Sequence, residues 1–227
     1  MKTRIIKPAK DQTPEIVRCT GWFVLLICPL PLIPIMTGDN RFVFHMALLF
    51  TGWCCWTFTE YCIHRFKDHG ESYMAGEGHE SMHHLHHKHP TEIAISPLHR
   101  AGLLILCGVL MLLALWFDDY FTLIPGFVMG FTGYTFMHWF LHHKLSARLF
   151  PELHRFHIHH HCKHPDKCFG ITITWWDHLF GTVPKVNTEI TERIRSFYYK
   201  REKEVKRVIS LNNIMDEKIQ LNEKQST

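Results

Sequence analysis

The sequence is poor in charge and lacks the patterns that mark several common classes of protein. Asp, Glu, Lys and Arg make up only 20% of its 227 residues, and the formal net charge is +4. No basic stripe alternates with aromatic residues and no zinc-finger spacing is present, which argues against a nucleic-acid partner. Its eight cysteines include no two closely spaced pairs and lie mostly in apolar runs, where cysteine behaves as a small hydrophobic residue. We therefore expect free thiols and no disulfide framework.

A cleavable signal sequence is also missing. A basic stretch precedes the first apolar run, but no pattern of small residues follows it, as cleavage would require. The run is therefore expected to stay in the protein as a membrane anchor. Apart from an enrichment in histidine, no internal repeat or low-complexity segment is present.

Apolar residues are abundant. They make up 46% of the chain, including 17 Phe and 7 Trp, and they gather in four segments: Thr20–Met36, Phe42–Thr59, Gly102–Phe117 and Tyr120–Leu141. A straight membrane crossing needs about 20 apolar residues, so the first and third segments are slightly short. Buried helices of a soluble bundle are the alternative, but Leu103–Trp116 has no polar face, which favours a helix that contacts lipid.

The lengths of the connections and the distribution of positive charge predict the topology. Only short turns join the first segment to the second and the third to the fourth, which predicts two hairpins. Lys and Arg gather before the first segment, between the hairpins and after the fourth segment, so both termini and the middle connection are expected in the cytoplasm. We predict an all-α, multi-pass membrane protein with four transmembrane helices and a cytoplasmic helical cap.

Three parts of the chain follow from this topology. Residues 1–19 form a cytoplasmic N-terminal segment, residues 20–187 a membrane-embedded domain, and residues 188–227 a charged C-terminal helix and tail. Apolar residues at helical spacing within this last part are compatible with a helix on anionic lipid or with a solvated helix.

Histidine is the most unusual feature of the sequence. Eighteen of the 20 histidines lie between His64 and His164, and most of them fall into four groups. The groups are His64 and His69; His79, His83, His84, His86, His87 and His89; His138, His142 and His143; and His154, His157, His159, His160, His161 and His164. Residues three and four apart share a helix face, so the last three groups can each direct two or three imidazoles to one point. His64 and His69 converge only if their helix ends or bends between them.

The number of convergent imidazoles, about ten, exceeds what one first-row metal ion binds. We therefore predict a dinuclear metal site in the cap. Imidazole suits Fe, Zn, Cu and Ni, and iron supplies redox chemistry that would explain a site beside the bilayer. Glu60, Asp166 and Asp177 are candidates to orient an imidazole from outside the ligand shell. No catalytic residue distinct from the metal ligands is predicted.

The same residues resemble a known family. The chain is similar to the fatty acid hydroxylase and sterol desaturase superfamily, and most to its fatty acid 2-hydroxylase branch, roughly from Trp56 to Pro184. The matching motifs are Glu60-Tyr61, His64-Arg65-Phe66, His79-x3-His83-x2-His86-His87, His138-Trp-Phe-Leu-His142-His143, His157-x2-His160-His161, Phe169-Gly-Ile-Thr172 and Trp176-Asp177-x2-Phe180-Gly181-Thr182.

The resemblance implies two iron ions in the working enzyme, with zinc as a possible substitute in isolated protein, and O2 as co-substrate. It implies the metal ligands His64, His69, His83, His86, His87, His138, His142, His157, His160 and His161. His79, His143 and Asp177 are possible further ligands or outer residues. The electron donor would be a separate protein of the cytochrome b5 or ferredoxin type, and basic residues would dock it: Lys88, Arg100, Lys144 and Arg148.

The expected activity is O2-dependent hydroxylation of a membrane lipid's acyl chain, in a fatty acid or sphingolipid, at carbon 2. The chain departs from the branch in three places, which leaves the substrate open. Thr135 follows Tyr134, and Thr91 follows Pro90, where the branch usually has Asp in each case. Residues 94–100 replace a Pro-rich stretch of the branch. Sterol, carotenoid or ether-lipid oxidation by the same site is the alternative. A histidine-rich metal transporter is a third hypothesis, although the apolar segments carry few ionisable residues. The sequence does not define the oligomeric state.

Overall fold

Helices form all the regular structure that the computed structural model describes, in residues 12–27, 29–30, 41–69, 82–90, 95–114, 116–117, 119–184 and 189–199. No strand occurs among these residues, so the all-α prediction is confirmed for them. The helices are α1 (Thr13–Ile27), α3 (Arg41–Cys62), η1 (Ile63–Asp68), α5 (Met82–Lys88), α6 (Pro97–Leu113), η2 (Asp119–Thr122), α7 (Leu123–Leu141), α8 (Ser146–Leu149), α9 (Pro151–Cys162), α10 (Trp175–Phe180) and α11 (Glu192–Tyr199).

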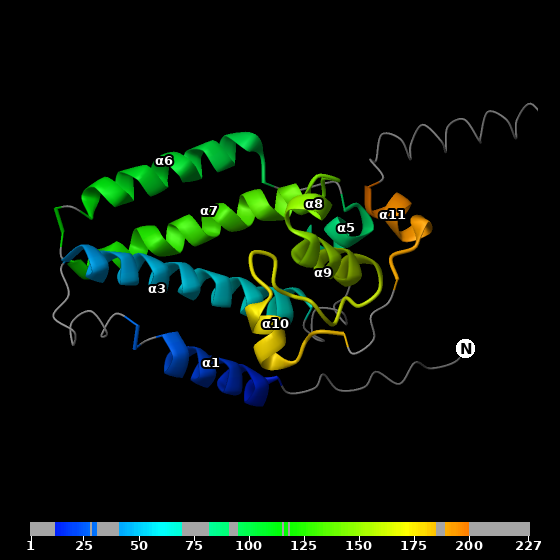
Figure 1. Ribbon diagram of the computed structural model, residues 1–227, viewed down its shortest axis with the longest axis horizontal. Helices are drawn as coiled ribbons and strands as arrows, with labels where there is room; N and C mark the ends of the chain where they lie inside the picture. Colours follow the sequence, from blue (N-terminus) through cyan, green and yellow to red (C-terminus); the bar gives the residue numbers. More distant parts are fainter. Residues whose placement is uncertain are drawn as a thin grey trace, which may run out of the picture.

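The four long helices lie side by side in the order α6, α7, α3 and α1 (Figure 1). The closest pair is α3 with α7, and glycines make this approach possible. A Cβ atom at Gly52 would lie 2.2 Å from the carbonyl oxygen of Leu123, and one at Gly126 would lie 2.3 Å from that of Leu49. Small residues of this kind let two helix backbones meet, as they often do in membranes.

The helices match three of the four expected apolar segments closely. Helices α3, α6 and α7 cover the second, third and fourth segments, with α6 starting earlier because Ser96 caps it and Pro97 occupies its first turn. Helix α1 begins seven residues before the first expected segment, at Thr13, and ends at Ile27. Residues 31–36 of that segment lie outside the described residues.

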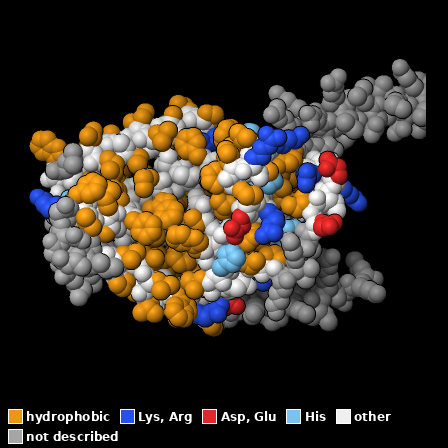
Figure 2. Space-filling view, viewed as in Figure 1, with side chains coloured by type: hydrophobic (Ala, Val, Ile, Leu, Met, Phe, Trp, Pro, Cys, Tyr) orange, Lys and Arg blue, Asp and Glu red, His pale blue; other side chains and the backbone are white. Residues whose placement is uncertain are grey.

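The face of the molecule in Figure 2 has an apolar and a polar part. Hydrophobic side chains cover much of the part formed by the long helices, whereas charged and histidine side chains show mainly near the short helices (Figure 2). On α6, Ile105 and Leu112 are 69% and 65% exposed. Among the described residues, one helix, Arg41–Asp68, is long and apolar enough by length and composition to cross a membrane, and Pro97–Leu113 is a shorter apolar helix.

Short helices form a cap at one end of the long ones. Helices α5, α8, α9, α10 and α11 gather where α3 and α7 end (Figure 1). Helix α10 is anchored by an aromatic cluster in which Trp176 and Phe180 pack on Phe58 of α3 and on α1 through Phe23. The cap therefore rests directly on the ends of the helices that carry the histidine motifs.

Candidate metal centre

A π-helical turn brings the first two histidines together. Helix α3 continues as the π-helix η1, and the amide of His69 donates to the carbonyl oxygen of His64 at 3.2 Å. Because a π-helix bonds residues five apart, His64 and His69 lie on one face, with ring centroids 5.1 Å apart. The sequence predicted that these two histidines converge only if their helix ends or bends between them. The change from α-helix to π-helix produces this convergence.

Ten histidines form two groups in the cap, and they are the ten that the resemblance implies as ligands. In each group the candidate ligand atoms lie within 4.8 Å of one another. Group A consists of His64, His69, His83, His87 and His160. Group B consists of His86, His138, His142, His157 and His161.

The two HxxHH motifs are each divided between the groups. On α5, His83 and His87 face group A while His86 faces group B. On α9, His157 and His161 face group B while His160 faces group A. Residues four apart share a face and adjacent residues point about 100° apart, so one helix turn supplies both groups. Each group is completed by a pair from a long helix or its extension, η1 for group A and the end of α7 for group B.

Imidazole nitrogens face one another in each group, and in group A hydrogen bonding among neutral rings does not explain their spacing. In group A the Nε2 atom of His83 lies 3.2, 2.7 and 3.0 Å from the Nε2 atoms of His64, His69 and His87. A neutral imidazole carries one N–H, so one nitrogen cannot satisfy three others. In group B the Nε2 atoms of His86 and His138 are 2.9 Å apart, and those of His142 and His157 are 3.0 Å apart.

Burial lowers the pKa of imidazoles in both groups and so favours their neutral form. It lowers the pKa of His69 to about 4 and that of His87 to about 2, with neighbouring histidines adding to the effect. The pKa values of His157, His160 and His161 are also well below the usual value, mainly because of burial. Neutral imidazole is the form that binds a metal ion.

The donor set fits a metal ion in each group. Nitrogens at about 2.1 Å from an ion and at right angles to one another would be about 3.0 Å apart, which is close to the Nε2 spacings above. In addition, His160 Nε2 and both ring nitrogens of His161 are buried without a hydrogen-bond partner. A cation in each group would satisfy one nitrogen of each ring, whereas a packed apolar core would not.

Backbone carbonyls fix the orientation of two rings of group A. The Nδ1 atom of His64 lies 2.6 Å from the carbonyl oxygen of Phe169, and that of His160 lies 2.7 Å from the carbonyl oxygen of Lys167. An Nδ1–H that donates to each carbonyl leaves the lone pair on Nε2, facing the group. The connection between α9 and α10 therefore acts as an outer support of group A.

Glu60 and Asp177 hold this connection. Two oxygens of Asp177 accept from the amides of Phe169 and Gly170, at 2.9 and 2.8 Å. Glu60 accepts from the amides of Ile171 and Thr172, at 2.7 and 3.0 Å, and from the Thr172 hydroxyl. Burial raises the pKa of the Asp177 carboxyl, and the Thr182 hydroxyl and the two amides lower it. We expected direct contacts from carboxylate to imidazole; the structure instead shows Glu60 and Asp177 bonded to the backbone that orients His64.

The remaining expected residues lie outside the two groups. His79 falls outside the described residues. The Nδ1 atom of His143 contacts the carbonyl oxygen of Trp139 at 2.8 Å. His84 and His89 are exposed, His154 contacts the Tyr199 hydroxyl, and Asp166 is exposed.

Sequence reasoning missed Tyr198, which covers group B. It is fully buried, its hydroxyl donates to the carbonyl oxygen of Leu141 at 3.0 Å, and its ring stacks on His142 at 4.8 Å. The apolar spacing within residues 188–211 indicated a helix, but nothing in it indicated that this helix would pack on a histidine group.

Apolar helices that end in two histidine groups are compatible with a metal-dependent membrane protein. The sequence model of the fatty acid hydroxylase family matches residues 49–182, a range that contains all ten histidines. Because this match covers more than half of the chain, the chain belongs to the fatty acid hydroxylase family.

Relatives with curated functions agree with this membership. The chain is 34% identical over 137 residues to the dihydroceramide fatty acyl 2-hydroxylase FAH2 of Arabidopsis thaliana, over 58% of each chain. It is 33% identical over 178 residues to FAH1 of the same plant, over 75% of this chain and 70% of that one. The solved structure of full-length scs7p, in which only the hydroxylase domain is visible, matches with 23% identity and a TM-score of 0.48 over 80% of this chain and 67% of that chain. The match to FAH2 spans little more than half of that relative's length.

Proposed function

We propose that this chain is a membrane-bound di-iron oxygenase that hydroxylates the acyl chain of a fatty acid or sphingolipid, at carbon 2. The main support is the pair of five-histidine groups at the ends of α3 and α7 in a member of the fatty acid hydroxylase family. The names of two relatives, both dihydroceramide fatty acyl 2-hydroxylases, support the substrate class and the carbon.

The ten histidines of groups A and B would hold one iron ion in each group. When bound, these ions supply the redox chemistry by which one atom of O2 enters a C–H bond and the other leaves as water, with two electrons and two protons. The protein contributes neutral imidazoles held in place before a metal binds. It also contributes the support of the 167–172 connection, which fixes the rings of His64 and His160.

Aromatic packing between α3 and α7 forms an apolar wall beside group B. Trp56 packs against Phe127, Phe131 and Tyr134, with ring centroids 5.3, 4.6 and 5.8 Å away. The Tyr134 ring in turn lies 5.7 Å from that of His138. Such a wall excludes water beside the group and suits an acyl chain that enters from the bilayer. Because the groups lie at the ends of the apolar helices, carbons near the lipid head would reach them first.

The topology and the donor are parts of the same proposal. Helices α1, α3, α6 and α7 would cross the membrane as two hairpins, with the termini and the cap in the cytoplasm, within the divisions 1–19, 20–187 and 188–227. A separate acidic electron-transfer protein of the cytochrome b5 or ferredoxin type would dock on the cap.

One of the basic residues expected to dock the donor is in the wrong place. Lys88, Lys144 and Arg148 are exposed, whereas Arg100 is buried. Its Nε–H donates to the carbonyl oxygen of Thr135 at 3.1 Å, and its guanidinium packs on Trp139. Arg100 is therefore not available to a docking protein, because it lies on the face of α6 that packs against α7.

Incubation with isotopically labelled O2 tests the activity. The membrane-reconstituted enzyme is supplied with labelled oxygen gas, a reductant and a lipid mixture, and the lipids are analysed by mass spectrometry. We expect the label in a hydroxyl group on an acyl chain, at carbon 2. A product that has only lost two hydrogens would indicate desaturation, and metal uptake without any change in lipid would favour a transporter. Oxygen label in a sterol or carotenoid would instead support the alternative substrates.

A further inference from the structure

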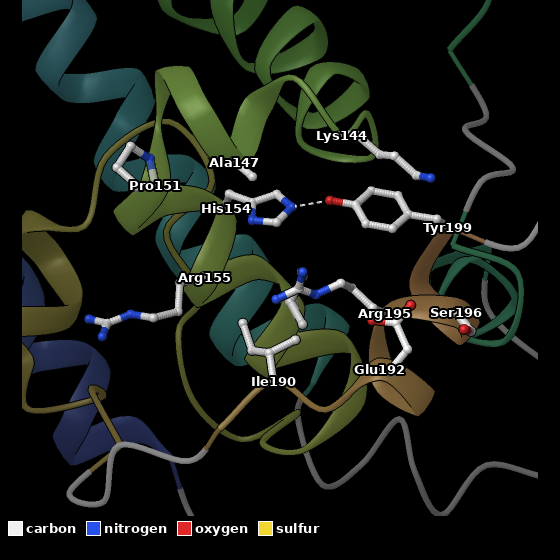
Figure 3. A pocket seen from close by; sticks show the side chains of 11 residues that line it. Lys144, Ala147, Pro151, His154, Arg155, Ile190, Glu192, Arg195, Ser196 and Tyr199 are labelled. Carbon is white, nitrogen blue, oxygen red and sulfur yellow. Dashed lines mark hydrogen bonds between the residues drawn. The ribbon is translucent and has the colours of Figure 1, made fainter.

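A pocket of about 780 Å³ lies between α9 and α11, on the side of α9 away from group A. Figure 3 shows His154 near its centre, bonded to Tyr199, with Arg195 beside it and Lys144 and Arg155 toward opposite sides. Apolar side chains, among them Ile158 and Ile190, complete its lining. Its size is typical of a site for a small molecule.

The charges on the pocket favour an anion. Lys144, Arg155 and Arg195 line it, and Glu192 is the one acidic side chain among its lining residues. The three cations come from three different elements: the turn after α7, α9 and α11. Arginine binds phosphate in a planar, bidentate manner and lysine binds it as a point charge, so a phosphate between Lys144 and Arg195 would link the turn after α7 to α11.

The position of α11 matters for group B. Tyr198, on this helix, stacks on His142, and its ring centroid lies 5.7 and 6.1 Å from those of His161 and His157. The next residue, Tyr199, contacts His154 in the pocket. A ligand that holds α11 against α9 therefore also holds Tyr198 over group B.

The neighbouring turn indicates where the anion comes from. Around α8, Leu145, Leu149 and Phe150 are 52%, 60% and 41% exposed, and Lys144 and Arg148 are exposed beside them. Exposed Leu and Phe next to basic residues are typical of a segment that lies in the headgroup region of a bilayer. The pocket begins at this segment, because Lys144 and Ala147 line it.

We propose that the pocket between α9 and α11 binds the phosphate of an anionic phospholipid headgroup and thereby fixes α11, with Tyr198, over group B. Lys144 and Arg195 contact the phosphate, Arg155 adds positive charge on the opposite side of the pocket, and the apolar lining contacts the glycerol region. Anionic lipid in the surrounding leaflet then controls how firmly group B is covered. This site is separate from the acyl substrate, and its occupancy does not depend on the hydroxylase activity.

Amide hydrogen exchange in α11 tests the proposal. The metal-loaded protein is placed in nanodiscs of phosphatidylcholine, with or without phosphatidate, and exchange is followed in residues 192–199. We expect phosphatidate to slow this exchange. Arg195→Met should weaken the effect by roughly fivefold, the contribution of one basic residue at an anionic surface, while Arg195→Lys should retain most of it. The matched control is Arg193→Met on the same helix, because Arg193 is exposed and does not line the pocket.

Three results would overturn the proposal. The first is equal exchange in both kinds of nanodisc. The second is an equal loss of protection in Arg195→Met and Arg193→Met, which would indicate nonspecific surface charge. The third is full protection by inorganic phosphate in phosphatidylcholine nanodiscs, which would make the ligand free phosphate and not a lipid headgroup. The oxygen-labelling experiment is a separate measurement. Its failure would refute the proposed hydroxylase activity but would not change the outcome of the hydrogen-exchange test.

Discussion

The substitution Asp177→Asn tests how the outer support of group A affects metal binding, because it leaves all five histidines of the group unchanged. The carboxylate of Asp177 is fully buried and accepts from Phe169 N at 2.9 Å, Gly170 N at 2.8 Å and the Thr182 hydroxyl at 2.6 Å. Asparagine keeps one acceptor oxygen and puts an NH2 group where the other was. If the retained oxygen takes the place of Oδ1, the Gly170 N–H faces a donor and loses its partner.

The size of the effect follows from these contacts. Loss of one hydrogen bond to a buried charge should lower the free energy of unfolding by about 1.5–3 kcal/mol. The Phe169 carbonyl that orients His64 belongs to the same connection, at 2.6 Å from His64 Nδ1. Loss of an outer support of this kind costs about 10- to 100-fold in metal affinity. We therefore expect group A to release its metal first, while group B keeps its own.

Metal titration with a chelator, together with chemical denaturation, measures both effects. The matched control is Glu152→Gln, since Glu152 also bonds to the region of α10, through Thr174 and His178, but at the surface. We expect this control to stay within about 0.5 kcal/mol of the wild type. An Asp177→Asn protein that is destabilised but retains two metals with unchanged affinity would refute the link from Asp177 through Phe169 to His64.

Four further predictions concern the centre, the core, pH and topology. Elemental analysis should find two metal ions per chain; His142→Ala should lower this number and the activity, whereas exposed His84→Ala should change neither, and a full metal content in His142→Ala would contradict the assignment. Gly126→Ala should lower stability by about 1–3 kcal/mol, because its Cβ would lie 2.3 Å from the Leu49 carbonyl oxygen, whereas Gly133→Ala, with no atom within 4 Å, should be tolerated in thermal unfolding. The metal-free protein should lose stability as pH falls from about 6.5 toward 4, because His69 has a pKa of about 4 when folded and the unfolded state binds more protons in that window; a flat stability profile there would count against burial of neutral imidazoles. Single cysteines introduced as Asn40→Cys and Asp119→Cys should react only with reagent on the side opposite the cap, and labelling from the cytoplasm would disprove the four-crossing topology.

The family resemblance selected the ten histidines that gather in the cap, and local spacing accounts for several of their pairs. His83 with His87, His138 with His142, and His157 with His161 are each four residues apart, and this spacing places both rings on one helix face whatever surrounds the helix. Long apolar stretches likewise located α3, α6 and α7, because hydrophobic segments of this length form helices that bury or embed their side chains. The charged segment after residue 188 also yielded a helix, α11.

Tertiary structure decided how those histidines are shared. Adjacent residues such as His86 and His87 belong to different groups only because α5 lies between η1, which brings His64 and His69, and the end of α7, which brings His138 and His142. Sequence spacing defines the face of one helix but not which other helices that face meets. The same reason explains Tyr198 over His142, Glu60 and Asp177 on the backbone of residues 169–172, and Arg100 against α7. Asp177 bonds to the amides of Phe169 and Gly170, eight and seven positions away, but the other contacts join residues 35 to 112 positions apart, and only the packing of whole helices determines them.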